Sequence, residues 1–301
     1  MAMAHMMAQW AVEHDRHIHL LTVNHNLRDA SQAEAEQVGQ WSKDFPNSSH
    51  HILTWNYNTR PETAVMEQAR NARYALMAEY CKLNNINVLS IAHHADDQLE
   101  TFMFRLAKGS GLDGLCGMAE WTDYSDDLKI YRPLLTQTHN DLIAYCQSHH
   151  LQWIEDPSNK NPDYARPRLR KALAGEGFDS KRFVKTLGRL SRAQNALDEI
   201  AENTLLSLRK QGSDDEIPDQ VREGNFMLID FQKLQTHPHD IQIRVLQKAL
   251  LQVGETQSGY PPKLERLEDI HETIRPSKSA TLFGCLITLS QDGKTLEIRR
   301  V

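Results

Sequence analysis

The residues best suited to chemistry form one dense run from His93 to Thr101, with the sequence HHADDQLET. It lies where an apolar, strand-like segment gives way to a helical pattern. On that helix Asp97 and Glu100 are one turn apart on the polar face. Such a carboxylate pair can hold Mg²⁺ bound to a nucleotide or orient an attacking amine, and His94 lies beside it. The apolar face comprises Leu99, Phe102, Met103 and Leu106.

Two other interpretations of the same run are open. The acidic residues Asp96, Asp97 and Glu100 can simply complement the positive end of the helix dipole. Alternatively, His93, His94, Asp97 and Glu100 can be ligands of a transition metal in a hydrolase.

Two further segments are candidates for ligand contact. The helix continues through Arg105 into Lys108, Gly109 and a glycine-rich loop, where backbone amides can approach an anion closely. The sequence after the strand that ends at Val23 is NHNLR, which places His25 and Arg28 at the edge of a sheet. An ordinary helix C-terminus and a solvated loop histidine explain the same residues taken singly.

A basic segment follows the turn from Asp156 to Asn159. Residues 160 to 192 contain ten Lys or Arg against three Asp or Glu, a local charge of +7 in a chain whose net charge is −6. A cationic segment on an acidic body is typical of a polyanion site, although a solvated basic helix face is the simpler alternative. The candidates for contact with a polyanion are Arg166, Arg168, Arg170 and Lys171.

The first half alternates strand and helix patterns, which predicts crossover connections and therefore an α/β fold with a parallel sheet covered by helices. Ligand sites in such sheets form beyond the carboxyl ends of the strands. We expect strands at 19–23, 51–55 and 88–92 and helices at the N-terminus, 30–44 and 62–83.

The second half predicts a smaller α+β domain, with the domains at 1–178 and 179–301. A long polar helix at 181–210 leads to an acidic linker, a strand at 226–230 and helices near 241–251 and 263–274. We expect a terminal hairpin in which ATLFGCLITL and TLEIRRV flank a turn at Asp292-Gly293.

Composition excludes several classes of protein. The 301 residues include 40% hydrophobic and 25% charged residues, as in ordinary globular proteins. No run approaches the roughly 18 apolar residues of a membrane span, and the N-terminus has no cationic leader. The four cysteines are scattered without a C-x-x-C pair, so we expect a cytoplasmic protein without a disulfide framework or an iron–sulfur cluster.

Several motifs together resemble the tRNA(Ile)-lysidine synthase family of N-type ATP pyrophosphatases. In chain order they are VNHNLR, ARNARY from Ala69 to Tyr74, AHHADDQLETFMFRLAKGSGLDGL, RPLL from Arg132 to Leu135, and DPSN with the arginines after it. The resemblance spans nearly the whole chain. It implies an adenine nucleotide alpha hydrolase-like sheet with helices on both faces, and the terminal hairpin resembles the family's smaller substrate-binding domain.

The resemblance implies that ATP, Mg²⁺ and L-lysine convert the wobble cytidine of a tRNA(Ile) with a CAU anticodon into lysidine, through an adenylated tRNA. Asp97 and Glu100 would hold Mg²⁺ or orient the lysine amine, with His94 beside them. His25 and Arg28 would flank the nucleotide, and Arg105, Lys108 and Gly109 would face phosphate. Arg166 and Arg170 would bind tRNA or the triphosphate, on a loop set by Asp156 and Asn159. A homodimer is left open.

One departure from the family stands out. Its members open with a strand and a Ser-Gly-Gly-x-Asp-Ser loop for pyrophosphate, whereas this sequence begins with what resembles the following helix. A start codon placed too far downstream and a truncated tRNA-binding remnant both explain this. The intact motifs elsewhere favour the first. A tRNA cytidine thiolase is a further alternative, which the lack of C-x-x-C pairs disfavours.

Overall fold

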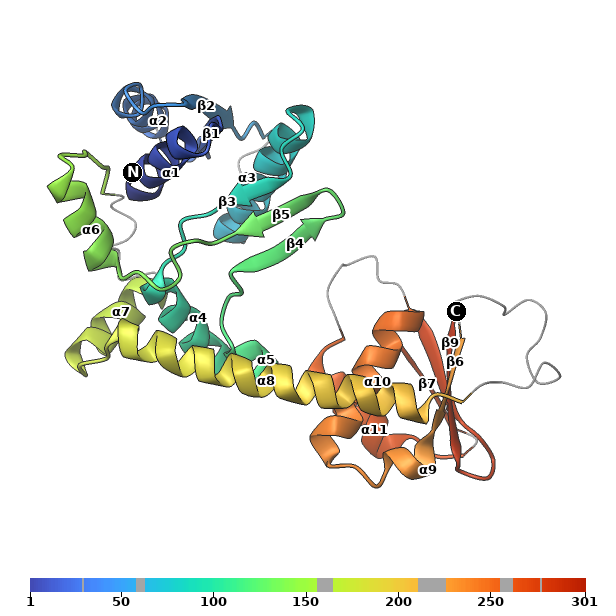
Figure 1. The fold of residues 1–301 in the computed structure, drawn as a ribbon. Coiled ribbons are helices and arrows are strands. Elements are labelled where there is room, and N and C mark those ends of the chain that lie inside the picture. The colour runs from blue at the N-terminus through green and yellow to red at the C-terminus, as the bar shows by residue number, and fades with distance from the viewer. Residues whose placement is uncertain (29, 58–62, 156–164, 211–225, 255–261, 277) are drawn as a thin grey trace. The chain divides into compact units, whose positions relative to one another are not determined.

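The computed structural model describes residues 1–28, 30–57, 63–155, 165–210, 226–254, 262–276 and 278–301. The chain divides into two compact units (Figure 1). The first contains Met1–Ser110 and Gly114–Gly188, and the second contains Gly111–Asp113 and Arg189–Val301. The second unit resumes at Arg189, within a long helix. The sequence predicted the domain boundary slightly earlier, after residue 178.

The first unit alternates helices and strands, as the sequence predicts. β1 pairs in parallel with β2, and β3 pairs in parallel with β5, so the crossover connections are confirmed. Its elements are α1 (Ala2–Glu13), β1 (Ile18–Asn24), α2 (Ser31–Trp41), β2 (Ser48–Thr54), α3 (Val65–Leu83), β3 (Val88–Ser90), α4 (Ala95–Ala107), β4 (Trp121–Ser125), β5 (Leu128–Tyr131), α6 (His139–Ser148), α7 (Ala165–Gly175) and the start of α8 (Ser180–Leu208).

The strands of this unit form two sheets, β1-β2 and β3-β5-β4. The hairpin from β4 to β5 was not expected from the sequence. Every residue of β4 is exposed, so the strand has no buried apolar face and lacks the alternation by which strands are recognised. Its antiparallel pairing with β5 places a short edge strand beside the parallel pair.

Helix α3 joins the two sheets through one hydrophobic core. Its buried side chains Ala69, Tyr74, Met77 and Cys81 recur at helical spacing and therefore lie on one face. Three of them, Tyr74, Met77 and Cys81, pack with buried residues of β3 and β5. Partly buried residues of β1 and β2 pack against the same cluster, so α3 holds a fixed position over the strands of both sheets.

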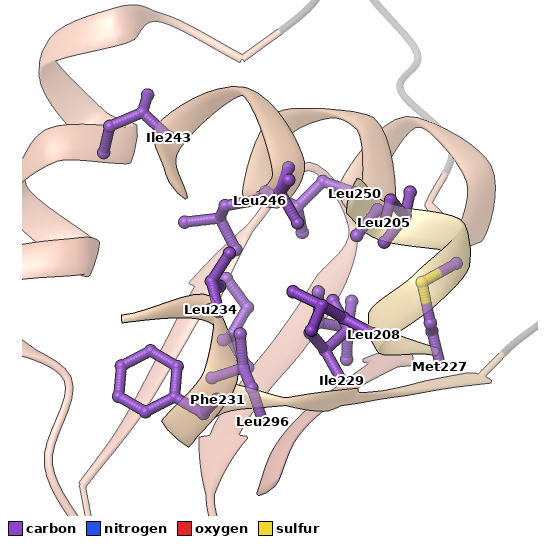
Figure 2. Packing of buried hydrophobic residues seen from close by; sticks show 14 of the residues in the cluster. Leu205, Leu208, Met227, Ile229, Phe231, Leu234, Ile243, Leu246, Leu250 and Leu296 are labelled. Atoms are coloured by element: carbon purple, nitrogen blue, oxygen red, sulfur yellow. The ribbon is translucent and has the colours of Figure 1, made fainter. Parts of the chain in front are cut away.

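The second unit is an antiparallel sheet covered by helices. Its strands β6 (Phe226–Asp230), β7 (Ser279–Leu282), β8 (Cys285–Leu289) and β9 (Thr295–Arg300) have the order β6-β9-β8-β7. Its helices are the rest of α8, α5 (Leu112–Leu115, of which 112–113 belong to this unit), α9 (Phe231–Leu234), α10 (His239–Val253) and α11 (Leu264–Thr273). Figure 2 shows the apolar side chains from α8, α9, α10 and the sheet meeting in one core.

The terminal hairpin is only partly as expected. β8 and β9 pair across the turn that contains Gly293, whose φ of +70° suits glycine. However, ATLFGCLITL is two strands rather than one. Phe283 and Gly284 both have positive φ and reverse the chain between β7 and β8. Glycine's tolerance of this conformation was the available signal, because the apolar pattern itself is continuous.

Within the described residues, no helix combines the length and apolar character that crossing a bilayer requires.

Candidate active site

The acidic run from the sequence analysis lies at the start of α4, just beyond β3. His94 is the N-cap residue, and its backbone N–H donates to Asp97 Oδ2 at 3.0 Å. This bond satisfies a polar group at the helix entrance and fixes the Asp97 carboxylate there. The predicted helix start beyond a strand is therefore confirmed, and the functional role of its residues stays a prediction.

Glu100 lies one turn further along α4 and is only 2% exposed. Its Oε1 accepts a hydrogen bond from Arg170 Nε of α7, and Arg170 Nη2 is 3.8 Å from Asp97 Oδ1. A buried carboxylate is costly unless a charged partner stabilises it. Arg170 is such a partner, so the residues that the sequence assigned to two roles, catalysis and RNA contact, form one cluster.

The imidazole of His94 lies between two carboxylates. Its Nδ1 is 3.3 Å from Asp96 Oδ2 and its Nε2 is 3.5 Å from Asp97 Oδ2. Burial lowers the pKa of His94, but the bond with Asp96 and the charges of Asp97 and Asp96 outweigh it, so the pKa is raised. His94 is thus biased toward the cationic form, which can donate protons from both ring nitrogens.

Asp96 joins three helices at this point, which the sequence analysis did not foresee. Its carboxylate accepts from the backbone N–H of His139 at 2.7 Å and from the Ser180 hydroxyl at 2.7 Å. Burial raises the pKa of Asp96, but hydrogen bonds from His94, His139 and Ser180 hold it well below its usual value. His139 and Ser180 are distant from Asp96 in sequence, so their contacts with Asp96 could not be predicted from the sequence.

An open pocket of about 390 Å³ adjoins this cluster. It combines the carboxylates of α4 with Arg170 and the N-terminal ends of α6 and α8. Its size suits a small molecule, and its charges of both signs suit a zwitterionic or phosphorylated one. The residues around it are His94, Asp96, Leu99, Glu100, Thr138, His139, Asn140, Arg170, Leu173, Phe178, Asp179 and Ser180.

The residues predicted to flank a nucleotide, His25 and Arg28, both follow the end of β1. His25 follows β1 with a buried Nδ1 that has no hydrogen-bond partner, and burial together with the charge of Arg73 lowers its pKa. Arg28 is exposed and pairs with Glu34 of α2 at 2.8 Å. A neutral His25 ring suits contact with a nucleobase or a sugar hydroxyl, and this role remains a prediction.

The glycine-rich loop after α4 is held by Arg105. Its Nη1 donates to the carbonyls of Gly114 at 2.7 Å and Gly117 at 2.8 Å, so the guanidinium organises the loop in this structure. Lys108 is exposed, and Gly109 has a φ of +73° with no atom near its missing Cβ. Phosphate contact by these three residues remains a prediction.

Only some of the α7 residues that are predicted to contact RNA have side chains in the described part of the structure. Arg168 and Lys171 are exposed on the helix that carries Arg170. The helix includes Arg166, whose side chain is outside the described part, and Asp156 and Asn159 lie outside the described residues altogether. The exposed cations of α7 are therefore accessible to a polyanion beside the carboxylate cluster.

The donor set fits Mg²⁺ better than a transition metal. No group of three or more His, Cys, Asp or Glu among the described residues is arranged to hold a metal ion. Mg²⁺ is commonly held by one or two carboxylates together with substrate phosphates and water. Asp97 and Glu100 can supply the carboxylates. Arg170 beside both carboxylates reduces their charge, so phosphate ligands would be needed to complete such a site.

The chain is similar to known proteins over most of its length. The PP-loop domain family matches residues 1–176, which contain the cluster at α4. The tRNA(Ile)-lysidine synthase of Rhodopseudomonas palustris is 32% identical over 311 residues, covering 97% of this chain and 85% of the relative. The chain belongs to the tRNA(Ile)-lysidine synthase family. The resemblance drawn from the sequence motifs is thereby confirmed.

Other members of the tRNA(Ile)-lysidine synthase family are longer. The Wolbachia pipientis protein is 33% identical over 293 residues, which are 94% of this chain and 64% of the relative. The Ruegeria pomeroyi protein is 31% identical over 290 residues, which are 95% of this chain and 65% of the relative. The chain thus spans just under two thirds of the length of these two relatives. Among solved structures, the U34-tRNA thiolase NcsA from Methanococcus maripaludis aligns with a TM-score of 0.49 and 13% identity over 62% of this chain and 68% of that chain.

Proposed function

We propose that this chain ligates L-lysine to C2 of the wobble cytidine of a tRNA(Ile) with a CAU anticodon, at the expense of ATP. The observation that carries the proposal is the cluster of His94, Asp97, Glu100 and Arg170 beside an open pocket, within a PP-loop domain of the lysidine synthase family. PP-loop membership implies ATP binding, and the relatives' name implies a tRNA substrate.

The proposed reaction has two steps. The C2 oxygen of cytidine attacks the α-phosphorus of ATP, and the bond to the β-phosphate breaks to release pyrophosphate. The neutral ε-amine of lysine then attacks C2, the C2–O bond breaks, AMP leaves and the new nitrogen loses a proton. Activation is needed because the cytosine C2 oxygen is a poor leaving group, whereas AMP is a good one.

The carboxylates of α4 would serve the amine or the metal. Asp97 is fixed by the N–H of His94 and presents its other oxygen, Oδ1, toward Arg170, so an ammonium or a Mg²⁺ ion would find an oriented acceptor. Bound Mg²⁺ would neutralise charge on the phosphates of ATP. Glu100, held by Arg170, would keep the site anionic, and cationic His94 would donate hydrogen bonds to a phosphate or carbonyl oxygen.

The basic segment would bind the RNA. Arg168 and Lys171 are exposed on α7, and the surrounding segment has a local charge of +7 against an acidic remainder. Concentrated cations of this kind contact phosphates, and the acidic remainder disfavours binding elsewhere. A cytoplasmic location suits a substrate of this kind.

A direct assay tests the proposal. The full chain is incubated with a tRNA(Ile) transcript bearing CAU, ATP, Mg²⁺ and labelled L-lysine, and label in RNA is measured. We expect lysine-dependent labelling and pyrophosphate release. D97N should lower both by at least about 100-fold, because it removes a charged acceptor from the reacting centre. Asp123, an exposed acid on β4, supplies the matched control D123N, which should retain activity.

The possible failures separate the alternatives. Salt-dependent tRNA binding without ATP consumption would identify a non-catalytic RNA-binding protein and contradict the ligase. Stoichiometric zinc or iron in the purified chain would favour a metal-dependent hydrolase. Full activity in D97N would show that Asp97 is not part of the reacting centre.

A further inference from the structure

The arginines of the motif ARNARY form a cationic group on α3. The proposed ligase reaction assigns no role to this group. The guanidinium carbons of Arg70 and Arg73 lie 5.1 Å and 5.6 Å from the centroid of the Tyr74 ring. Arg70 Nη2 also donates to the Tyr74 hydroxyl at 3.5 Å. Two arginines thus gather around one buried ring, an arrangement that cation–π attraction stabilises.

A third arginine approaches the same ring from the end of β5. Arg132 is 9% exposed, and its Nη1 donates to the Ala119 carbonyl at 2.9 Å and to Thr122 Oγ1 at 2.8 Å. Its Nε is buried and has no hydrogen-bond partner. Burial lowers the pKa of Arg132, Tyr74 raises it and the positive charge of Arg70 lowers it again, so Arg70 and Arg132 are close enough to repel each other.

His93 completes this group from the end of β3. Its Nδ1 is buried without a partner. Burial holds the pKa of His93 below its usual value; Asp97 opposes this, while Arg132, Arg70 and Arg73 reinforce it. His93 is therefore within electrostatic range of the three arginines and has a buried ring nitrogen without a hydrogen-bond partner.

Among the described residues, the charges of Arg70 and Arg132 are poorly compensated by carboxylates. In the described part of the chain, neither Arg70 nor Arg132 has a carboxylate within ion-pair distance. Clustered cations, one of them buried, are costly unless an anion joins them. The unsatisfied nitrogens of Arg132 and His93 are donors or acceptors that such an anion could meet.

An aromatic ring beside the cluster narrows the chemistry of the anion. Tyr124 of β4 lies over Tyr74 with ring centroids 6.1 Å apart and an interplanar angle of 16°, and it is 43% exposed. Arginines interleaved with an accessible aromatic ring are typical of nucleotide binding, where cations contact phosphate and rings stack on bases.

We propose that Arg70, Arg73 and Arg132, the arginine cluster, bind the phosphate of a nucleotide, with His93 as an additional hydrogen-bonding partner. The nucleotide belongs either to the triphosphate of ATP or to an RNA chain, since both present the same phosphate chemistry. The site is additional to the carboxylate cluster of α4, and it does not require the proposed ligase activity.

Direct binding by the full chain tests this site. Arg132 is left intact because its hydrogen bonds hold β4, and the exposed side of the cluster is changed instead, in R70Q/R73Q. Affinities for inorganic pyrophosphate and ATP are measured by calorimetry without lysine, and affinity for tRNA by filter binding at several salt concentrations. The matched control is K82Q, which removes an exposed charge from the same helix. Circular dichroism and Tm establish that each variant is folded.

We expect R70Q/R73Q to lower the affinity for at least one of the three ligands by about tenfold or more. R70K/R73K should keep most of the affinity, and K82Q should bind like the native chain. Loss of pyrophosphate and ATP binding alone identifies the nucleotide triphosphate. Loss of tRNA binding alone, with a salt slope smaller by about 1 to 2, identifies RNA phosphate.

Unchanged binding of all three ligands by R70Q/R73Q would overturn the site, as would an equal loss in K82Q or a native chain that binds none of them. A native chain that forms no lysidine, yet loses phosphate binding in R70Q/R73Q, would refute the proposed ligase and leave this site standing.

Discussion

At the scale of single residues, the pairing of Glu100 with Arg170 decides the character of the site. In the sequence alone, Glu100 is a carboxylate on a polar helix face and Arg170 is one cation in a basic segment. Together they place a buried negative charge under a guanidinium that also approaches Asp97. The pair therefore links α7, with its exposed cations, to the carboxylates of α4.

The same pair makes a residue-scale prediction about stability. R170A should lower the free energy of unfolding by about 2 kcal/mol, because it leaves Glu100 buried without this cation. The value is below the roughly 3–5 kcal/mol of a fully buried pair, since Arg170 is 41% exposed. Urea unfolding at pH 7 measures the change. K171A, an exposed neighbour, should shift it by less than about 0.5 kcal/mol, and equal effects in the two variants would contradict the prediction.

At the scale of elements, the N-terminus of α6 is fixed by its capping box. Thr138 Oγ1 accepts from the backbone N–H of Asp141 at 3.2 Å, and the Asp141 carboxylate accepts from the N–H of Thr138 at 2.9 Å. Hydrogen bonds from Lys181 and Thr138 lower the pKa of Asp141 to about 2, so it is charged at neutral pH. This cap aims the first turn of α6 at Asp96 and the pocket.

Removing the cap should loosen that turn. T138A should destabilise the chain by about 1 kcal/mol, the usual loss for an N-cap threonine. It should also raise the KM for ATP or lysine if α6 orders the pocket. Thermal unfolding and steady-state kinetics measure the two effects, with the exposed Thr136 changed to Ala as the control. A T138A variant as stable as T136A would show that the cap contributes nothing.

The β1-β2 pair should respond to acid. His19 bonds Tyr80 at 2.8 Å and stacks on His51, with His17 nearby. Burial, and then the charges of His17 and His51, lower the pKa of His19. A lowered pKa means that the unfolded chain binds more protons. The stability is therefore complete above the unfolded pKa of about 6.5 and is lost as pH falls below it toward the folded pKa.

Thermal unfolding between pH 8 and pH 5 measures this effect. The native Tm should fall with acid, and H19Q should flatten the fall, because glutamine keeps a hydrogen-bonding group for Tyr80 without titrating. His14 is the exposed C-cap residue of α1, and H14Q serves as the control, for which we expect the native slope. A slope in H19Q as steep as in the native chain would exclude His19 as its source.

At the scale of the whole molecule, the two units have separate hydrophobic cores. The core of the second unit contains Ile287 and Ile298 with no exposed surface, while that of the first gathers around α3. I298A should cost about 2–5 kcal/mol in the second unit, through lost burial and the cavity it leaves. A chain with two separate cores need not unfold in one step. The unfolding transition of the first unit should therefore change little in I298A.

Calorimetry resolves the transitions, and hydrogen exchange assigns them to the two units. Leu206 lies on the same helical element as the core residue Leu205 but is 61% exposed, so L206A should cost well under 1 kcal/mol. An equal loss across both units in I298A would show that the cores unfold together.

The sequence by itself determined the local elements and the family. Helix patterns at α3, α8 and α10, the strand β6 and the parallel crossovers all followed from periodicity and chain direction, which are properties of neighbouring residues. The motifs determined membership of the lysidine synthase family, and HHADDQLET pointed to the helix start that holds His94, Asp97 and Glu100.

Tertiary structure alone decided which of those residues meet. Two partners of Asp96, His139 and Ser180, are 43 and 84 positions away, and the Glu100–Arg170 pair spans 70 positions. The exposed strand β4 lacks the apolar alternation from which a strand is predicted. Arg132 comes near Arg70 only because β5, which ends just before Arg132, packs against α3. The physical reason is that periodicity records which face of an element is buried, whereas contacts between polar groups depend on how buried faces pack, and that is a property of the folded chain.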